Sequence, residues 1–215
     1  MRHGKDEEGF RGGWSQRGLV AEGIQQSYRL GKYLRENHKD FNITRIISSD
    51  LKRALDTSKF IAESLQLPIE KSKEWRETNN GLLAGMPNDE ANEKFPGLYF
   101  NRLRMDERYP GGESPIENFT RIRSVLEKTL ADQISGNRRE NVVIVTHGGV
   151  INIVYHILKE IEWTNKNKFF PIFHTSIHKI EFVKNKWKIT QENVVDHFKY
   201  NGIKMKRGKM NIDKS

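Results

Sequence analysis

The stretch Asn141-Val142-Val143-Ile144-Val145-Thr146-His147-Gly148-Gly149 gives the clearest indication of the fold. Its first five residues are nearly all apolar and β-branched, a pattern typical of a strand buried on both faces of a sheet. Two glycines follow, and a helical apolar pattern then continues to Leu158. A buried strand that leads straight into a helix is the repeating unit of α/β folds with parallel strands. We therefore expect a three-layer α/β/α sandwich with a mostly parallel central sheet.

The same alternation of strands and helices extends along most of the chain. We predict helices over residues 21–39, 51–65, 115–133 and 148–158, and strands over 43–47, 141–145, 173–182 and 187–190. Residues 81–112 are rich in glycine, proline and asparagine, which favours an irregular insertion or lid. With no internal repeat in 215 residues, one domain over 1–215 is the simplest organisation, and it ends in a basic tail at about 199–215.

Composition narrows the classes of function. Hydrophobic residues make up 35% and charged residues 30% of the chain, as in a globular protein, and there is no cysteine for disulfides or thiol catalysis. No apolar run approaches the roughly 18 to 20 residues that cross a membrane, and no secretion signal opens the chain, so we expect a cytoplasmic protein without a membrane partner. The net charge of +9 is diffuse and lacks the aromatic-basic pattern of nucleic-acid modules. It favours small phosphorylated partners over nucleic acid.

Three segments place cationic side chains where a strand meets a helix. They are Arg2-His3-Gly4, Arg53 in the first turn of the helix after strand 43–47, and His147 at the end of strand 141–145. Ligands bind at this edge of parallel α/β sheets, and free N–H groups at helix starts suit phosphate. Two guanidiniums and two imidazoles together can bind a tetrahedral dianion. Taken singly, Arg53 could equally form an ion pair on a helix surface. His147 alone could equally be a hydrogen-bonded polar group at a strand end.

The order of four motifs resembles that of a known family. The motifs are Arg2-His3-Gly4, Ser49-Asp50-Leu51-Lys52-Arg53-Ala54, Arg76-Glu77-Thr78-Asn79-Asn80-Gly81 and Thr146-His147-Gly148-Gly149. In this order they are similar to those of the histidine phosphatases, also called the phosphoglycerate mutase-like superfamily, and the resemblance covers nearly the whole chain. It implies a phosphoglycerate mutase-like fold, a small phosphorylated substrate, and neither a metal nor a cofactor.

The resemblance also implies a role for each motif residue. It makes His3 the residue that attacks phosphorus and forms a phosphohistidine, which divides one difficult displacement into two easier ones. It makes Arg2, Arg53, His147 and Gly148 the residues that bind the phosphate oxygens and stabilise their charge in the transition state.

An acidic residue is needed to protonate the departing alcohol oxygen. The resemblance assigns this role to Glu77, which lies ahead of a glycine-rich turn, and a water activated by the same carboxylate then releases phosphate. Glu74, three residues away, is the rival, but the family spacing to Gly81 and Gly85 favours Glu77.

The resemblance favours hydrolysis over mutase activity. Residues 81–112 are of moderate length where the family's mutases usually carry a longer insertion, and the loop 5–14 looks shortened. The forms Gly-Gly-Glu-Ser at 111–114 and Thr-His-Gly-Gly at 146–149 also look more like the phosphatases. Gly9 stands where the family often has an Asn that helps to hold phosphate. A phosphoglycerate mutase-type transferase and a catalytically impaired regulatory or binding member are the alternatives.

Other residues are open to two interpretations. Arg102, Arg104 and Arg108 suit either contacts to a second anionic group or a solvated basic face. His174 and His178 alternate along an expected strand. Structural or surface roles are favoured for both over metal binding, which would need a matching carboxylate ligand.

Only Met1 precedes the first motif, where the family has an apolar strand near the middle of its sheet. Without that strand, His3 lacks part of its support. We therefore expect the first core strand to be missing before Arg2, and the native protein to start about eight residues earlier, enough for one strand. A truncated chain that folds poorly is the alternative.

Overall fold

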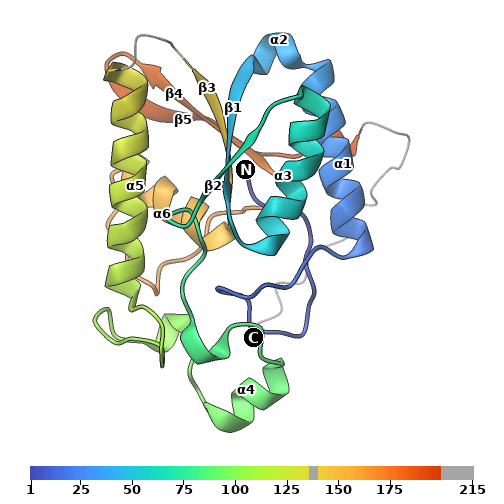
Figure 1. The fold of residues 1–215 in the computed structure, drawn as a ribbon. Helices are drawn as coiled ribbons and strands as arrows, with labels where there is room; N and C mark the ends of the chain where they lie inside the picture. The colour runs from blue at the N-terminus through green and yellow to red at the C-terminus, as the bar shows by residue number, and fades with distance from the viewer. Residues whose placement is uncertain (136–139, 200–215) are drawn as a thin grey trace.

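Helices and strands alternate along the chain (Figure 1). A computed structural model describes residues 1–135 and 140–199. The α-helices are α1 (Ala21–Glu36), α2 (His38–Phe41), α3 (Lys52–Leu65), α4 (Asn88–Lys94), α5 (Pro115–Ser135) and α6 (Gly148–Leu158). The strands are β1 (Ile43–Ser49), β2 (Ile69–Ser72), β3 (Asn141–Val145), β4 (Ile177–Val183) and β5 (Lys186–Val194). Short 3-10 helices are η1 (Gly81–Leu83), η2 (Phe100–Arg102) and η3 (Asp196–Phe198).

Three strands form a parallel sheet in the order β2-β1-β3. In the central strand, Ile46 is in register with Ile69 of β2 on one side and Val143 of β3 on the other. The expected parallel sheet is therefore confirmed. Its edge strand β2 is an element that the sequence pattern did not predict.

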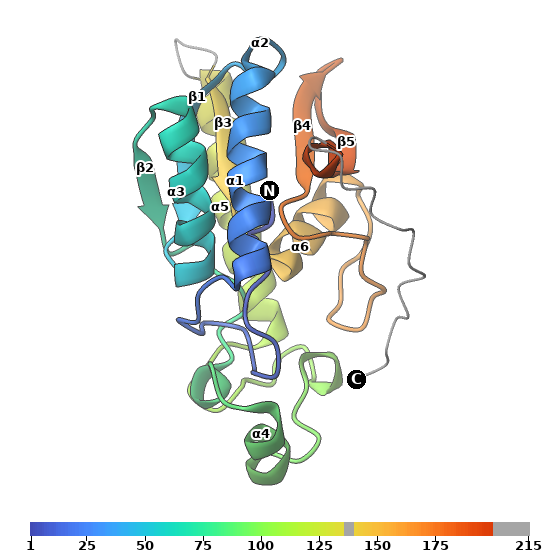
Figure 2. The same cartoon turned by 90° about the vertical axis from the view of Figure 1, so that its right-hand side faces the viewer.

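Helices cover both faces of this sheet (Figure 1; Figure 2). On one face, Val143 and Val145 pack in a core with α1 and α3. On the other face, Val142 and Ile144 pack against a core with α5 and α6. Successive strand residues point to opposite faces, so one uninterrupted apolar run supplies both cores. The layers are the predicted three: α1 with α3, the sheet, and α5 with α6.

The first motif lies between two parts of the fold that are far apart in sequence. Residues 1–3 run between the end of β3 and the segment that precedes β4. His3 N–H donates to the Thr146 carbonyl at 3.0 Å on one side, and Arg2 N–H donates to the Ser176 carbonyl at 3.3 Å on the other. The expected strand before Arg2 concerns residues outside this sequence and stays a prediction.

The last two strands form a separate antiparallel hairpin. The sequence prediction placed the start of the first of them at residue 173, but β4 begins at Ile177. The reason is a turn at Thr175, whose φ of 56° lies in the left-handed region and is incompatible with a strand. His174 therefore lies in a turn and not in a strand.

Residues 81–112, called the lid here, are not irregular throughout, because they hold η1, α4 and η2. The lid buries a small core of its own, formed by Leu83, Leu103 and Tyr109. Of the predicted basic tail, Lys199 pairs with Asp196 at 2.6 Å, and the remainder lies outside the described residues. Within the described chain, no helix combines the length and apolarity that crossing a membrane requires.

Candidate active site

His3 is buried, with 3% of its surface exposed. Its Nδ1 lies 2.7 Å from the Gly4 carbonyl oxygen, which can only accept a hydrogen bond. Arg53 Nε–H points to Nε2 from 3.3 Å, and a guanidinium can only donate. Both partners therefore place the proton on Nδ1 and leave the electron pair on Nε2. The pKa of His3 lies well below its usual value, because burial and then the neighbouring Arg53 and His147 oppose a charged ring.

The loop after His3 packs directly on α1, because glycines stand on both sides of the contact. A Cβ at Gly23 would lie 1.9 Å from the Lys5 carbonyl oxygen, and a Cβ at Gly4 would lie 2.6 Å from the Gly23 carbonyl oxygen. Neither position has room for a side chain. Gly4 N–H also donates to Thr57 Oγ1 of α3 at 2.9 Å. The backbone around His3 is thus fixed between the sheet and two helices.

Two guanidiniums border this ring. Arg53, in the first turn of α3, donates from its two Nη atoms to the carbonyls of Ser15 at 3.1 Å and Gly13 at 2.8 Å. Arg2 donates from Nη1 to the Ile172 carbonyl at 2.7 Å. Its Nε is buried and has no hydrogen-bond partner among the described residues. A buried donor without a partner indicates a place for an acceptor.

His147 is the N-cap residue of α6 and is fully buried. Its Nε2 lies 2.8 Å from Ser49 Oγ, which also accepts from Leu51 N–H at 3.4 Å. When that hydroxyl gives its own proton to Nε2, the ring proton lies on Nδ1. Nδ1 is buried and has no partner in the described part of the chain. The ring centroid lies 5.1 Å from that of His3. Burial, followed by the two nearby guanidiniums, lowers the pKa of His147 well below its usual value.

Glu77 faces the start of α6. Its carboxylate accepts the backbone N–H groups of Thr78 and Gly149, each at 3.0 Å. A Cβ at Gly149 would lie 2.4 Å from Glu77 Oε1, so this approach requires glycine. The rival Glu74 is exposed and accepts from the Ser72 hydroxyl at 2.7 Å. Of the two carboxylates, the structure places Glu77 beside the first turn of α6.

The motif residues come from four separate parts of the sequence and converge at the carboxyl ends of β1 and β3. The start of α6 joins them, since a Cβ at Gly148 would lie 3.7 Å from Arg2 Nε. Guanidiniums, imidazoles and a helix N-terminus in one place suit a tetrahedral anion. The structure thus brings together every residue that the motifs single out: Arg2, His3, Arg53, Glu77, His147 and Gly148.

A family model described as the histidine phosphatase superfamily (branch 1) matches residues 1–195. The chain belongs to this superfamily. The uncharacterized phosphatase PhoE of Bacillus subtilis (strain 168) is 31% identical over 180 residues, which cover 83% of each chain. Phosphoglycerate mutase-like protein 4 of Arabidopsis thaliana is 31% identical over 186 residues, 84% of this chain and 76% of its own. The solved structure of Bacillus stearothermophilus YhfR matches with a TM-score of 0.76 at 25% identity, covering 91% of this chain and 96% of its own.

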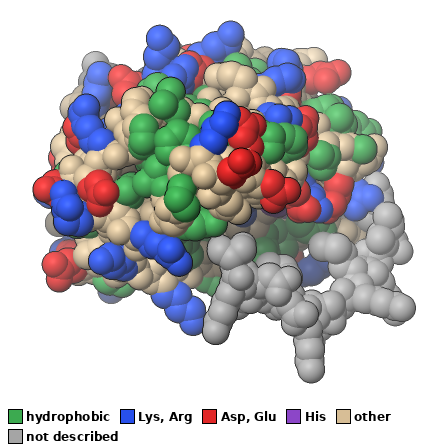
Figure 3. Space-filling model, turned by 90° about the horizontal axis from the view of Figure 1, so that it is seen from below, with side chains coloured by type: hydrophobic (Ala, Val, Ile, Leu, Met, Phe, Trp, Pro, Cys, Tyr) green, Lys and Arg blue, Asp and Glu red, His purple; other side chains and the backbone are tan. Residues whose placement is uncertain are grey.

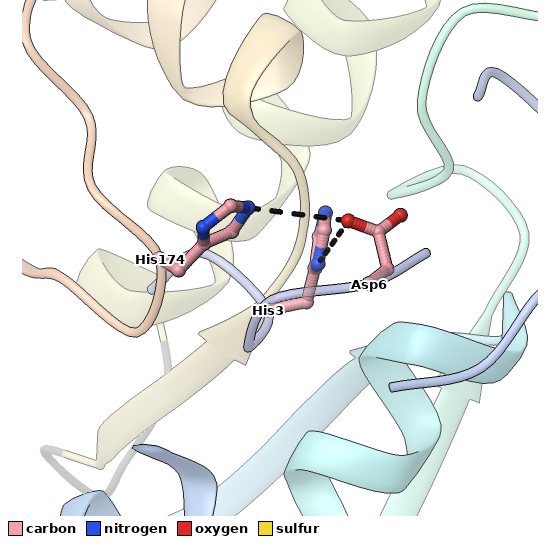
Figure 4. A group of neighbouring side chains, drawn as sticks. All are labelled: His3, Asp6 and His174. Carbon is pink, nitrogen blue, oxygen red and sulfur yellow. Dashed lines mark ion pairs between the residues drawn. The ribbon is translucent and has the colours of Figure 1, made fainter. Parts of the chain in front are cut away.

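In this histidine phosphatase superfamily member, two further side chains reach His3, namely Asp6 and His174 (Figure 4). Asp6 Oδ1 lies 4.0 Å from His3 Nδ1 and 3.9 Å from His174 Nε2, and Asp6 Oδ2 lies 3.5 Å from Arg53 Nε. The turn at Thr175 brings the His174 ring to 5.7 Å from that of His3, so His174 borders the site, and its favoured structural or surface role stays a prediction. Sequence reasoning missed Asp6, although its place three residues after His3 was a signal.

The same three residues, His3, Asp6 and His174, offer ligand atoms that all lie within 4.8 Å of one another. Imidazoles and a carboxylate form a set that zinc accepts. However, both ring nitrogens of His3 are engaged, and guanidiniums border the same space, which opposes a further cation. These surroundings oppose a metal ion at the set, and the expected absence of a metal stays a prediction. His178 lies apart from the set, hydrogen-bonded with the Tyr155 hydroxyl at 2.6 Å.

A cavity of about 410 Å³ adjoins the Glu77 carboxylate, and we call it the lid cavity. Its walls come from the first loop, the lid, α6 and the segment that follows α6, here represented by Arg11, Tyr109, Asn152 and Trp163. None of the three lid arginines considered above lines it.

Two of those arginines are engaged elsewhere. Arg104 and Arg108 are exposed and form ion pairs with Asp106 and Glu117. Their interpretation as contacts to a second anionic group is therefore not supported, and the alternative of a solvated basic face fits the structure.

Proposed function

We propose that the chain is a metal-independent phosphomonoester hydrolase that acts through a phosphohistidine at His3. The observation that carries this proposal is the electron pair on His3 Nε2, which accepts only from Arg53 Nε–H, beside two buried nitrogens without a partner among the described residues, Arg2 Nε and His147 Nδ1. Buried donors cost free energy unless an acceptor is bound. A phosphate group in this place would accept from both and present its phosphorus to Nε2.

In the first step, His3 Nε2 attacks phosphorus, and the bond between phosphorus and the alcohol oxygen breaks. Glu77, which two backbone N–H groups hold in place, transfers its proton to that oxygen, so a neutral alcohol leaves. The two guanidiniums, His147 and the Gly148 N–H at the start of α6 stabilise the charge on the phosphoryl oxygens. The product is a phosphohistidine.

In the second step, water gives a proton to the Glu77 carboxylate and attacks phosphorus, and the bond from nitrogen to phosphorus breaks. Inorganic phosphate leaves, and His3 and Glu77 return to their starting states. Arg53 must exchange its hydrogen bond with His3 Nε2 for one with phosphate. Its two anchors on loop carbonyls hold the guanidinium in place during this exchange. The scheme needs no metal or cofactor, and we expect it to operate on a small phosphorylated substrate in the cytoplasm.

The test is incubation with p-nitrophenyl phosphate, followed by peptide mass spectrometry of the acid-labile phosphoryl label. We expect release of inorganic phosphate and a label on His3, and the loss of both in His3→Asn. The matched control is His38→Asn, which changes an exposed histidine of α2. We expect this variant to keep both the release of inorganic phosphate and the label on His3. The mutase alternative is tested with 3-phosphoglycerate, which has a second hydroxyl: an isomeric ester as product in place of inorganic phosphate would establish a mutase. Absence of both turnover and label would leave the regulatory or binding alternative.

A further inference from the structure

The lid cavity carries chemistry that the proposed phosphate site, formed by Arg2, His3, Arg53, His147 and Gly148, does not use. Five asparagines and five aromatic residues line it. Among the described residues of its lining, only Arg11 and Glu77 are charged. Glu77 is already committed to the alcohol oxygen under the proposed function, so the rest of the cavity is free to contact the remainder of the alcohol.

Two of the asparagines offer donors to the cavity. Asn80 and Asn152 are buried, with 7% and 2% of their surfaces exposed. Their Oδ1 atoms accept the backbone N–H groups of Trp14 at 3.1 Å and Phe170 at 3.2 Å, which fixes the orientation of both amides. Over the described chain, neither Nδ2 donates to a protein acceptor. A ligand with uncharged acceptor atoms would satisfy these two groups.

Aromatic rings provide the apolar part of the lining. Phe169 remains 54% exposed although it borders the cavity, and Trp163 forms a buried wall at 8%. Seen from the α4 end of the molecule, hydrophobic side chains gather in the middle of the face, among basic and acidic ones (Figure 3). A flat ring placed against Phe169 would cover apolar surface that the protein leaves open.

The charge of the lining argues against a second anionic group on the substrate. Arg11 lies with its guanidinium 4.4 Å from the Tyr99 ring centroid and donates to Asn92 at 2.6 Å. It is the one cation of the described lining and shares the cavity with the Glu77 carboxylate. Specific binding of a carboxylate or phosphate commonly uses several charge-assisted contacts, and one guanidinium beside a carboxylate supplies few of them.

We propose that the alcohol portion of the substrate is uncharged and carries a flat heteroaromatic ring with hydrogen-bond acceptors, as in a nucleoside 5′-monophosphate. The volume of the lid cavity, about 410 Å³, lies in the range of small-molecule sites. Base rings stack on aromatic side chains, and carboxamides read their ring nitrogens. The position of the phosphate in this proposal rests on the proposed function, because the alcohol oxygen must lie at Glu77.

The first experiment compares kcat/KM for adenosine 5′-monophosphate, glucose 6-phosphate, 3-phosphoglycerate and methyl phosphate. The variant is Phe169→Ala, and the matched control is Phe182→Ala, an exposed phenylalanine of β4 outside the lining. We expect the nucleotide to exceed the two other metabolites by about tenfold, and Phe169→Ala to lower its kcat/KM by about tenfold, since stacking on one ring is of this size. For methyl phosphate, which has no ring, Phe169→Ala should change kcat/KM by less than about twofold.

The proposal is overturned if kcat/KM for glucose 6-phosphate or 3-phosphoglycerate equals that for the nucleotide. It is also overturned if Phe169→Ala lowers kcat/KM by the same factor for all four esters. Turnover of methyl phosphate without nucleotide preference would leave the proposed hydrolysis standing and remove only this inference. If the protein hydrolyses none of the esters, adenosine binding still tests the proposal. It is measured by titrating the protein with adenosine and recording tryptophan fluorescence. We then expect saturable binding that Phe169→Ala weakens by about tenfold, and the absence of binding would overturn the proposal.

Discussion

The phosphate site and the lid cavity meet at Glu77, but they are built in different ways. Side chains of the phosphate site are buried and held by backbone groups. Arg53 donates to two loop carbonyls, and His3 is hydrogen-bonded to the Gly4 carbonyl. The lid cavity is bordered in part by the lid, which has only a small core, and by rings as exposed as Phe169.

This difference teaches that reaction and substrate choice depend on separate elements. Groups that stabilise a transition state must be held in place before the reaction, and the sheet ends supply that rigidity. Discrimination between alcohols depends on contacts away from phosphorus, where a lid can change without loss of the chemistry. Four experiments test this division, in order of decreasing expected effect.

The division breaks if the reaction survives without His3. We expect His3→Asn to lower kcat for p-nitrophenyl phosphate by about 10³-fold or more, because an amide cannot form the phosphohistidine on which the proposed reaction depends. Because the residue is buried, thermal unfolding must show that the variant is folded. A folded variant that retains a tenth of the activity would contradict the assignment.

Placement of the Glu77 carboxylate is tested by two neighbouring glycines. In Gly149→Ala the added Cβ would lie 2.4 Å from Glu77 Oε1 and displace it, whereas in Gly148→Ala the nearest contact of the added Cβ is an ordinary 3.7 Å to Arg2 Nε. We expect kcat to fall by about 10²-fold in the first variant, the cost of a displacement near 1 Å. The second variant leaves the carboxylate in place, so its kcat should fall by less than that of the first. Equal losses in the two would show that the carboxylate position is not the cause.

The support of the phosphate site is tested by pH. His197 is buried, its Nε2 lies 2.8 Å from Thr175 Oγ1, and burial lowers its pKa to about 4. Below pH 6.5 the unfolded chain therefore gains a proton that the folded chain does not, and stability falls as pH falls from 6.5 towards 4. Urea unfolding should show that His197→Gln loses less stability than the parent between pH 7 and 5, by up to about 2 kcal/mol. His38→Gln, at an exposed position, should lose as much stability between pH 7 and 5 as the parent. If His197→Gln also lost as much as the parent, the assignment of this pH dependence to His197 would be contradicted.

The smallest effect concerns the carboxylate inside the phosphate site. Asp6 lies 3.5 Å from Arg53 Nε, and burial raises its pKa. Its charge repels a bound dianion, so Asp6→Asn should strengthen inhibition by sulfate about fivefold. Sulfate keeps its charge across the acidic range, so the parent alone should bind it more tightly as pH falls and Asp6 takes up a proton. Weaker sulfate binding in the variant would show that Asp6 helps to hold the anion.

The sequence predicted most of the fold because the apolar periodicity of its long elements is strong. It missed β2, since Ile69–Ser72 has only four residues, of which three are polar, and lies at the sheet edge. It extended β4 too far towards the N-terminus, because residues 173–177 look like a strand until one left-handed residue, Thr175, turns the backbone. Local propensity cannot reveal such a turn, which tertiary contacts impose.

The motif residues of the site could be predicted because their order along the chain resembles that of a known family, and Arg53, His147 and Gly148 also stand at a strand end or a helix start. Asp6 and His174 could not, since their meeting with His3 depends on how a loop and a turn from opposite ends of the chain pack together. The lid cavity was equally hidden. Its lining residues, such as Asn80 and Asn152, come from short segments far apart in the sequence, and no single hydrophobic pattern links these segments.

The bridge formed by residues 1–3 has a consequence for how the protein is made. Arg2 pairs with Thr146 on one side and with Ser176 on the other. A growing chain therefore cannot complete the phosphate site until the ribosome has released residues close to 180, when the earlier helices are long since synthesised. Contacts this distant in sequence are slow to form. Appearance of phosphatase activity during synthesis would then report the last stage of folding, and a chain stopped before β4 would hold its helices but no working site.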